Sequence, residues 1–328
     1  MQPPHASTPA VIVFGSINAD TSYRMPALPA PGETVLADAA AVSPGGKGAN
    51  QAIAASAAGA TTRMVGAIGD DTEGVSLLSA LAARGVDTDS IATRPGALTG
   101  RAMVLVDHAG ENSIVVLPGA NAQLDGQAAT EGLVSLAAGD VLVLQNEVPA
   151  AAGRAAAALA RRAGAFVIWN AAPAPARSDD LVHDIDLLVV NENELLQIAA
   201  LLGVGGAPAQ PGRDIRNLLA QTLAALRPEG GAMPQGVCTL GAEGAVYVDG
   251  ERSEHVAAPR VTAVDTTAAG DTVVGYLAAH HALPLEERLL LAASAGALTV
   301  TRAGASDSIP PLADVERMLT RHPERTTA

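Results

Sequence analysis

Short apolar runs alternate with longer segments of helical character along most of the chain. Runs rich in Val, Ile and Leu predict strands at 11–14, 63–68, 141–145, 166–170, 187–190 and 237–240. Ala- and Leu-rich stretches predict helices that end near residues 58 and 84, and further helices at 150–163, 213–226, 270–281 and 285–301. This alternation predicts an α/β fold with a Rossmann-like, mostly parallel sheet and helices on both faces.

Two segments, about 18–45 and 98–118, depart from the strand–helix alternation. Residues 99–106 and 112–116 alternate apolar and polar positions around the loop 108–112, which is typical of a hairpin. We expect the two segments to form a small β-sheet that lies over the main domain as a lid. A further run, 245–248, is expected to pair back on the preceding strand as an antiparallel edge.

The composition fits one large domain, predicted over residues 10–322, with disordered tails at 1–9 and 323–328. Of the 328 residues, 48% are hydrophobic but only 2% are aromatic, so Ala, Val, Leu and Ile must fill the core. The Pro- and Gly-rich stretch 203–212 is expected to be a loop within this domain.

Several classes of protein are disfavoured by the bulk properties. No apolar run reaches the roughly 20 residues of a membrane span, and the first ten residues lack the features of a signal peptide. The net charge of −14 argues against nucleic-acid binding. The single cysteine, Cys238, excludes an internal disulfide and is expected to be a buried strand residue. A cytoplasmic protein without a membrane partner is the simplest interpretation.

Asp271 follows a run of four small residues, 267–270, and precedes an apolar run that can continue as a helix. The start of a helix carries free N–H groups and the positive end of the helix dipole, so it can hold an anion. A carboxylate beside such a site could take the proton of a hydroxyl that attacks a phosphoryl group. The alternative is that Asp271 only caps its own helix.

Other polar residues fall at the carboxyl ends of predicted strands or at helix starts: Asn18, Asp20, Lys47, Asn50, Glu147 and Asn191. Ligands of open α/β sheets bind at that edge, and this set of carboxylates, amides and an ammonium suits a polyhydroxyl ligand. Lys47 is the only lysine among 20 basic residues. Either the compact ammonium group of lysine is required at this position, or the lysine is there by chance.

Three common motifs are missing from the sequence. The first strand is followed by GSINAD rather than G-x-G-x-x-G, which disfavours a dinucleotide oxidoreductase, and the glycines around Lys47 do not have Walker A spacing. No G-x-S-x-G nucleophile motif is present, and the seven histidines have no metal-ligand spacing.

The motifs that remain are, in order, GSINAD, GGKGANQA, GDD, GAN, NAAPAPA, NENE, TLGAEG and VDTTAAGDT. With them the chain resembles the ribokinase-like (pfkB) carbohydrate kinase family over about residues 10–322. GSINAD and GGKGANQA point to the ribose-specific members. The resemblance implies ATP-dependent phosphorylation of D-ribose at the 5-hydroxyl.

The resemblance also implies a role for each matching residue. Asp271 would be the catalytic base, and the N–H groups of Ala269, Gly270 and Asp271 would form an anion hole. The sugar would be bound by Asn18, Asp20, Gly46, Lys47, Gly48, Asn50, Glu147 and Asp271. The ATP site would be lined by Asn191, Thr239, Leu240, Gly241, Ala242, Glu243, Gly244 and Gly270.

Two cations and a dimer are implied in the same way. Glu194 would help to order Mg²⁺ through water. A potassium-type monovalent cation would activate the enzyme from a site formed by Asp265, Thr267, Thr299, Arg302, Gly304 and Ser308. Lids of this family commonly pair, so a homodimer through the lid is expected.

The sequence departs from the family pattern at a few positions. Val273 and Val274 stand where an aromatic residue usually follows GDT, which is expected to loosen the packing there, and Ala172 replaces a proline. Ala292 stands where a His or Asn often lies near the adenine.

Alternative functions are a kinase for deoxyribose, another sugar or a nucleoside, and a non-catalytic sugar-binding sensor. The chain has few aromatic residues to stack a nucleoside base.

Overall fold

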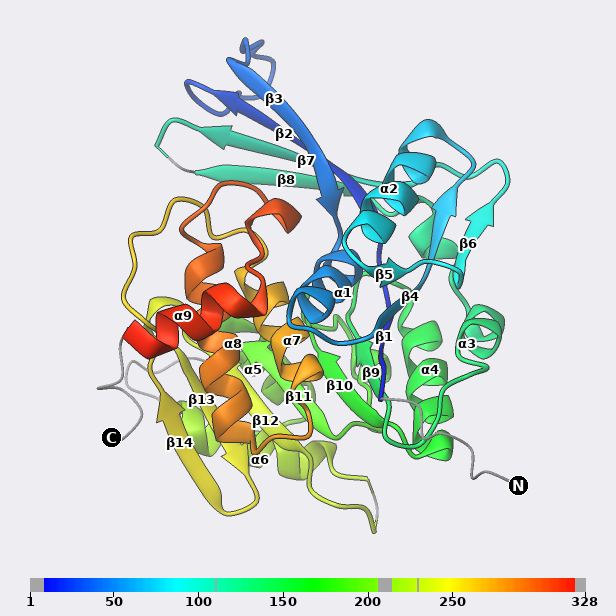
Figure 1. Ribbon diagram of the computed structural model, residues 1–328, viewed down its shortest axis with the longest axis vertical. Coiled ribbons are helices and arrows are strands. Elements are labelled where there is room, and N and C mark those ends of the chain that lie inside the picture. Colours follow the sequence, from blue (N-terminus) through cyan, green and yellow to red (C-terminus); the bar gives the residue numbers. More distant parts are fainter. Residues whose placement is uncertain (1–8, 110, 206–213, 229, 322–328) are drawn as a thin grey trace.

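A ten-stranded sheet forms the centre of the computed structural model, which describes residues 9–109, 111–205, 214–228 and 230–321 (Figure 1). Its strands are β1 (Val11–Phe14), β4 (Thr62–Gly69), β5 (Val86–Asp87), β6 (Ile91–Arg94), β9 (Val141–Leu144), β10 (Phe166–Asn170), β11 (Leu187–Asn191), β12 (Gln235–Thr239), β13 (Ala245–Asp249) and β14 (Arg252–Val256). The order is β14-β13-β12-β11-β10-β9-β1-β4-β5, with β6 also on β4. Neighbouring strands are parallel except at β12–β13 and β13–β14.

Helices cover both faces of this sheet. Successive residues of its strands point to opposite sides, so apolar strands present a hydrophobic surface on each face that must be buried. In β1, Val11 and Val13 join one hydrophobic cluster, whereas Ile12 and Phe14 join the other. The first cluster lies under α1 (Lys47–Ala57), α2 (Thr72–Ala83), α7 (Ala269–Ala279), α8 (Leu285–Thr299) and α9 (Leu312–Arg321). The second lies under α3 (Gly126–Gly132), α4 (Ala150–Ala163), α5 (Glu192–Leu201) and α6 (Ile215–Leu226).

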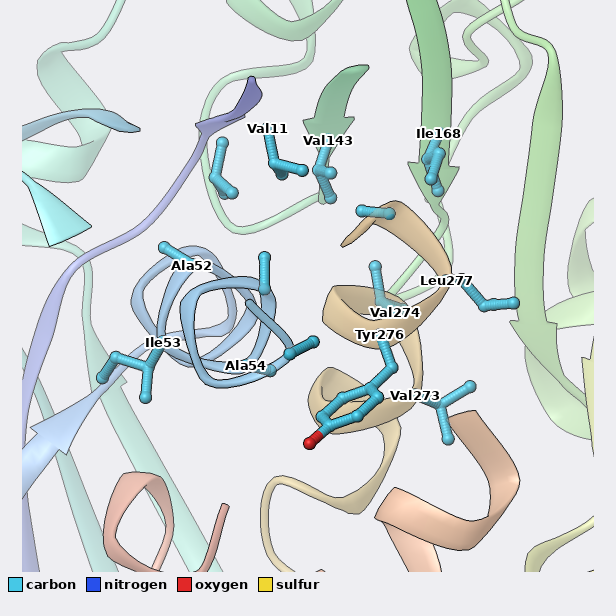
Figure 2. Packing of buried hydrophobic residues seen from close by; sticks show 14 of the residues in the cluster. Val11, Ala52, Ile53, Ala54, Val143, Ile168, Val273, Val274, Tyr276 and Leu277 are labelled. Atoms are coloured by element: carbon cyan, nitrogen blue, oxygen red, sulfur yellow. The ribbon is translucent and has the colours of Figure 1, made fainter. Parts of the chain in front are cut away.

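Small residues let α1 and α7 pack closely in the first cluster. Figure 2 shows Ala54 of α1 on the side of the helix that faces Val274 and Tyr276 of α7. A Cβ on Gly275 would lie 2.4 Å from the Cβ of Ala54 and 2.7 Å from backbone atoms of α1. The absence of a side chain at Gly275 therefore sets how near the two helices come.

A separate four-stranded sheet has the order β3-β2-β7-β8 and projects from one end of the molecule (Figure 1). It consists of β2 (Asn18–Met25), β3 (Ala39–Gly45), β7 (Gly100–Asp107) and β8 (Asn112–Leu117). β2 is antiparallel to β3 and parallel to β7, and β7 and β8 form the expected hairpin. We refer to this unit as the small sheet.

The fold class predicted from the sequence is confirmed, and most element boundaries agree within two or three residues. The last two long helices end earlier than expected, at Ala279 and Thr299, and the antiparallel edge contains a second strand, β14. Strands β5 and β6 and helices α3 and α9 were not anticipated. The predicted tails lie outside the described residues, apart from residue 9. The same holds for most of the predicted loop 203–212 and for Arg213 of the predicted helix 213–226.

Two expectations about individual features can be compared directly. Cys238 is fully buried in β12, as predicted, and burial raises the pKa of its thiol to about 12, ahead of the effects of Glu192 and Glu194. Among the described residues, no helix combines the length and apolar character needed to cross a membrane.

Candidate active site

Polar side chains gather where the carboxyl ends of the central strands meet the first turns of α1 and α7. Ser16 and Asn18 follow β1, Glu147 follows β9, and Asn170 ends β10. These segments are far apart in the sequence but adjacent in the sheet, since β1, β9 and β10 are neighbours. This is the edge at which open parallel sheets bind ligands.

Asp271 lies in the first turn of α7 and is 7% exposed. Its Oδ2 accepts a hydrogen bond from Asn50 Nδ2 at 3.0 Å, and its Oδ1 accepts one from Gln51 Nε2 at 2.9 Å. The N-cap of α7 is Ala268, and no side chain caps the helix. The interpretation of Asp271 as a cap for its own helix is therefore wrong, because its carboxylate is held by α1 instead.

The start of α7 has the features of an anion site. Ala268 adopts a left-handed conformation with φ of 60°, which costs an alanine on the order of 1 kcal/mol. The turn that it makes leads into the N–H groups of Ala269, Gly270 and Asp271, of which the first donates to Thr266 O over 3.4 Å. A Cβ on Gly270 would meet no heavy atom within 4 Å, so the backbone is open to a ligand there.

Glu147 is fixed by the start of α1. Its Oε2 accepts hydrogen bonds from the N–H of Lys47 at 2.9 Å and from the hydroxyl of Ser16 at 2.6 Å. Ser16 in turn accepts from the N–H of Gly48 at 3.2 Å. A Cβ on Gly48 would lie 2.6 Å from the backbone of Ser16, so only glycine allows this approach. Gly46, with φ of 82°, makes the preceding turn.

The site carries more negative than positive charge. Burial, and then the charges of Glu147 and Asp271, raise the pKa of Asp20 to about 7. The charge of Asp271, opposed by burial and helped by Glu147 and Glu194, raises the pKa of Lys47. Lys47 therefore stays protonated among these carboxylates.

Three oxygen atoms at this end of the sheet are buried and have no hydrogen-bond partner among the described residues: Asp20 Oδ1, Asn50 Oδ1 and Gln145 Oε1. Buried acceptors are costly unless a donor reaches them. Hydroxyl groups of a ligand are suitable donors, so this donor–acceptor set fits a polyhydroxyl molecule.

Asn18 is held by a residue to which the sequence analysis gave no role. Asn121 donates from Nδ2 to Asn18 Oδ1 at 2.8 Å and to Ile17 O at 3.1 Å, and it accepts from the N–H of Ile17 at 3.0 Å. The hydrogen bond from Asn121 orients the Asn18 side chain, whose Nδ2 group can donate to a ligand.

The residues expected at the nucleotide lie on two loops after neighbouring strands, β11 and β12. Asn191 and Glu194 form a capping box on α5, with hydrogen bonds of 2.9 and 2.8 Å. Burial raises the pKa of Glu194, although Asn191 and Lys47 act in the opposite direction.

The second loop is a tight turn with one buried glycine. Leu240 donates from its N–H to Gly244 O at 2.8 Å, and the turn encloses Gly241, Ala242 and Glu243. A Cβ on Gly244 would lie 2.1 Å from Val256 O, and the φ of Gly244 is 100°. Thr239 is bonded back to Val190 O at 3.4 Å. Gly241, Ala242 and Glu243 are exposed.

Three of the residues expected at a monovalent cation are joined directly. Asp265 accepts from the N–H and hydroxyl of Thr267, at 2.9 and 2.6 Å, and from the N–H of Gly304 at 2.9 Å. Burial tends to raise the pKa of Asp265, but these hydrogen bonds bring it below its usual value.

The other three expected cation ligands have side chains that are already bonded elsewhere. Arg302 pairs with Asp314 at 3.1 Å. The hydroxyl oxygen of Thr299 lies 3.0 Å from both Ala295 O in α8 and the Thr272 hydroxyl in α7, and the hydroxyl of Ser308 donates to Ala305 O. The side chains of these three residues are therefore engaged, which leaves backbone carbonyl groups as the ligands that a cation could use here. No cluster of three or more His, Cys, Asp or Glu side chains suited to a metal occurs among the described residues.

The departures from the family pattern are accommodated by packing. Val273 and Val274 are 8% and 0% exposed within the first core cluster, so both valines are buried at the positions where an aromatic residue is usual. Ala292 is fully buried in α8 and faces the same cluster.

The comparisons with known proteins agree with this geometry. A model of the pfkB family carbohydrate kinases matches residues 8–312. The ribokinase of Schizosaccharomyces pombe is 37% identical over 316 residues, which are 93% of this chain and 96% of that protein. The ribokinase structure from Thermotoga maritima has a TM-score of 0.81 at 30% identity and covers 95% of this chain and 100% of that chain. Arabidopsis thaliana ribokinase complexed with ribose and ATP has a TM-score of 0.79 at 29% identity, covering 95% and 99%. The chain therefore belongs to the pfkB family of carbohydrate kinases.

Proposed function

We propose that this protein transfers the γ-phosphoryl group of ATP to the 5-hydroxyl of D-ribose. The observation that carries the proposal is the buried carboxylate of Asp271, oriented by α1 at the uncapped start of α7 and close enough to Asp20 and Lys47 to alter their pKa values. The similarity to the ribokinases named above supports ribose as the sugar.

The chemistry follows from these positions. Asp271 takes the proton of the 5-hydroxyl, and the hydroxyl oxygen forms a bond to the γ-phosphorus as the bond to the β-phosphate oxygen breaks and ADP leaves. The N–H groups at the start of α7, with its dipole, stabilise negative charge on the transferring group. Lys47, Asn18, Asp20 and Glu147 hold the other hydroxyl groups of the sugar.

The nucleotide and the cations belong to the same proposal. The loops around Asn191 and Gly241 would hold ATP, and Glu194 would order Mg²⁺ through water, which neutralises phosphate charge. Two loops, one with Asp265 and Thr267 and the other with Gly304, would hold K⁺ mainly through carbonyl oxygens, and Thr299, Arg302 and Ser308 lie close to Gly304 in the sequence. Such a cation would shape the anion hole without touching the sugar.

The small sheet is proposed as a lid on a single domain over residues 10–322. Asp20 lies on β2, so a sugar bound to Asp20 is also in contact with the small sheet. We also propose that the small sheet pairs with that of a second copy. Strand β8 supports this, because its apolar residues Ile114, Val115, Val116 and Leu117 are all between 46% and 65% exposed.

The substitution Asp271→Asn tests the base. It keeps the shape and the neighbouring hydrogen-bonding groups but removes the proton acceptor, so kcat is expected to fall by about 10³-fold or more, while the affinity for ribose changes little. Both are measured with a coupled ATP-turnover assay containing Mg²⁺ and by calorimetric titration of ribose. A variant that retains most of its turnover would contradict the base.

The sugar is tested with the wild-type protein in the same assay. Ribose, deoxyribose, fructose, adenosine and inosine are compared, each with and without K⁺. Turnover of ribose ahead of the others, raised by K⁺, is the expected result. Binding of ribose without turnover of any compound would instead make this protein a sensor.

A further inference from the structure

Four buried side-chain amides form a connected network behind Asp271. Gln51 of α1 is fully buried and donates from Nε2 both to Asp271 Oδ1 and to Asn170 Oδ1, each at 2.9 Å. Its own oxygen accepts from Gln145 Nε2 at 2.8 Å. Asn50 completes the network on the other carboxylate oxygen.

A backbone carbonyl group fixes the direction of the hydrogen bonds that link Asn170, Gln51 and Gln145. Asn170 Nδ2 donates to Val189 O at 3.1 Å, and a carbonyl oxygen can only accept. The Asn170 oxygen must then face Gln51, so Gln51 presents its NH₂ group to it. The second hydrogen of that NH₂ group is directed at Asp271. If the Gln51 amide were rotated by half a turn, its oxygen would face two other acceptors, Asn170 Oδ1 and Asp271 Oδ1.

The network joins Asp271 to the rigid part of the fold. Gln145 follows β9 and Asn170 ends β10, two neighbouring strands in the middle of the large sheet. Asp271 itself lies on α7, which packs against α1 around Gly275. Through Gln51, the position of the Asp271 carboxylate depends on the position of the central strands.

We infer that Gln51 is a positioning residue for the reaction. It donates to one carboxylate oxygen of Asp271 and thereby fixes the rotation of that carboxylate, so that an unused lone pair points to the sugar hydroxyl. This inference rests on the proposed function of Asp271 as the base. It assigns the amide of Gln51 no contact with the sugar or with ATP.

The test uses Gln51→Met, which keeps the length and volume of the side chain but donates no hydrogen bond, with Gln51→Glu as a second variant. Loss of carboxylate alignment is expected to lower kcat about 10- to 100-fold, because misplacement by about 1 Å costs that much. The KM for the sugar is expected to stay within about threefold of wild type. Gln221→Met, at an exposed amide of α6 that donates to Asn217, is the matched control and keeps wild-type kinetics.

A second measurement separates positioning from a purely structural role. In an Asp271→Asn background, Gln51→Met is expected to cause no further loss of kcat, because it acts through the carboxylate that is already absent. Circular dichroism provides the folded fraction to which each rate is normalised.

The two proposals fail in different ways. Wild-type kcat in Gln51→Met, or an equal loss of kcat in both backgrounds, would overturn the role of Gln51 and leave Asp271 as the base. If the wild-type protein turns over another sugar, the proposed substrate fails, and the same Gln51 variants are measured with that sugar.

Discussion

Asp20 connects ligand binding to pH through its position between other acids. Burial is the largest cause of its raised pKa of about 7, followed by Glu147 and Asp271. Because the folded-state pKa lies above the unfolded value, the contribution of Asp20 to stability without ligand is fully present below about pH 4 and is lost as the pH rises through about 7. The hydroxyl groups of a sugar donate to the ionised form of Asp20, so the affinity for the sugar increases as the pH rises.

Ribose affinity is therefore expected to increase between pH 6 and pH 8. With a pKa of about 7, the ionised fraction of Asp20 rises about tenfold over this range, and the dissociation constant should fall by up to that factor. Calorimetric titration without ATP measures it, and two buffers of different ionisation enthalpy at pH 6.5 reveal the proton released on binding.

Asp20→Asn is the control for this pH dependence. The amide does not titrate, so the variant should bind ribose weakly with a nearly constant dissociation constant across the range. If the wild-type dissociation constant were also constant, ribose would not require the ionised form of Asp20.

At the scale of elements, the crossing of α1 and α7 positions the reactive groups. Asn50 and Gln51 reach Asp271 because Gly275 lets the two helices approach within contact of their backbones. The nearest atoms to a Cβ at Gly275 include Ala55 N and Gln51 O, both at 2.7 Å. These are backbone atoms, which cannot move away by a change of rotamer.

Gly275→Ala is expected to force the helices apart and to lower both the melting temperature and kcat. Overpacking of this kind costs about 1–3 kcal/mol of unfolding free energy. The displacement also lengthens the hydrogen bonds to Asp271, so kcat of the folded fraction should fall as well. Chemical denaturation and steady-state kinetics measure the two effects.

Gly153→Ala provides the matched comparison within another helix. A Cβ on Gly153 of α4 would meet no heavy atom within 4 Å, so the added methyl group should stabilise the helix by up to about 1 kcal/mol and leave kcat unchanged. Equal effects of the two substitutions would show that helix propensity, not the approach of α1 and α7, determines the outcome.

For the whole molecule, the sequence predicted the layers well because hydrophobic periodicity and strand-end polar residues are local signals. The strands that build the site, their helices and the hairpin of the small sheet were all recognisable. Strand β14 was not, because polar residues dominate it. Helix α9 was not either, although apolar residues alternate with polar ones along it in a pattern that is compatible with a helix. Gln51, Asn121, Gln145 and Asn170 received no role, since their importance lies in contacts between residues up to 220 positions apart. Three of the four lie in motifs that could have indicated one: Gln51 in GGKGANQA, Asn121 in GAN and Asn170 at the start of NAAPAPA.

The pairing of two copies that we propose concerns the whole molecule. Strand β8 is exposed on both of its faces, with Ile114 on one and Val115 on the other, so the small sheet has uncovered apolar surface whichever face a partner takes. The wild-type protein is expected to sediment as a dimer. The double variant Ile114→Lys, Val115→Lys places a charge on each face and should give a monomer, whereas Val134→Lys, at an 86% exposed position away from the small sheet, should remain dimeric. A wild-type protein that sediments as a monomer at micromolar concentration, or a double variant that still dimerises, would contradict pairing through β8.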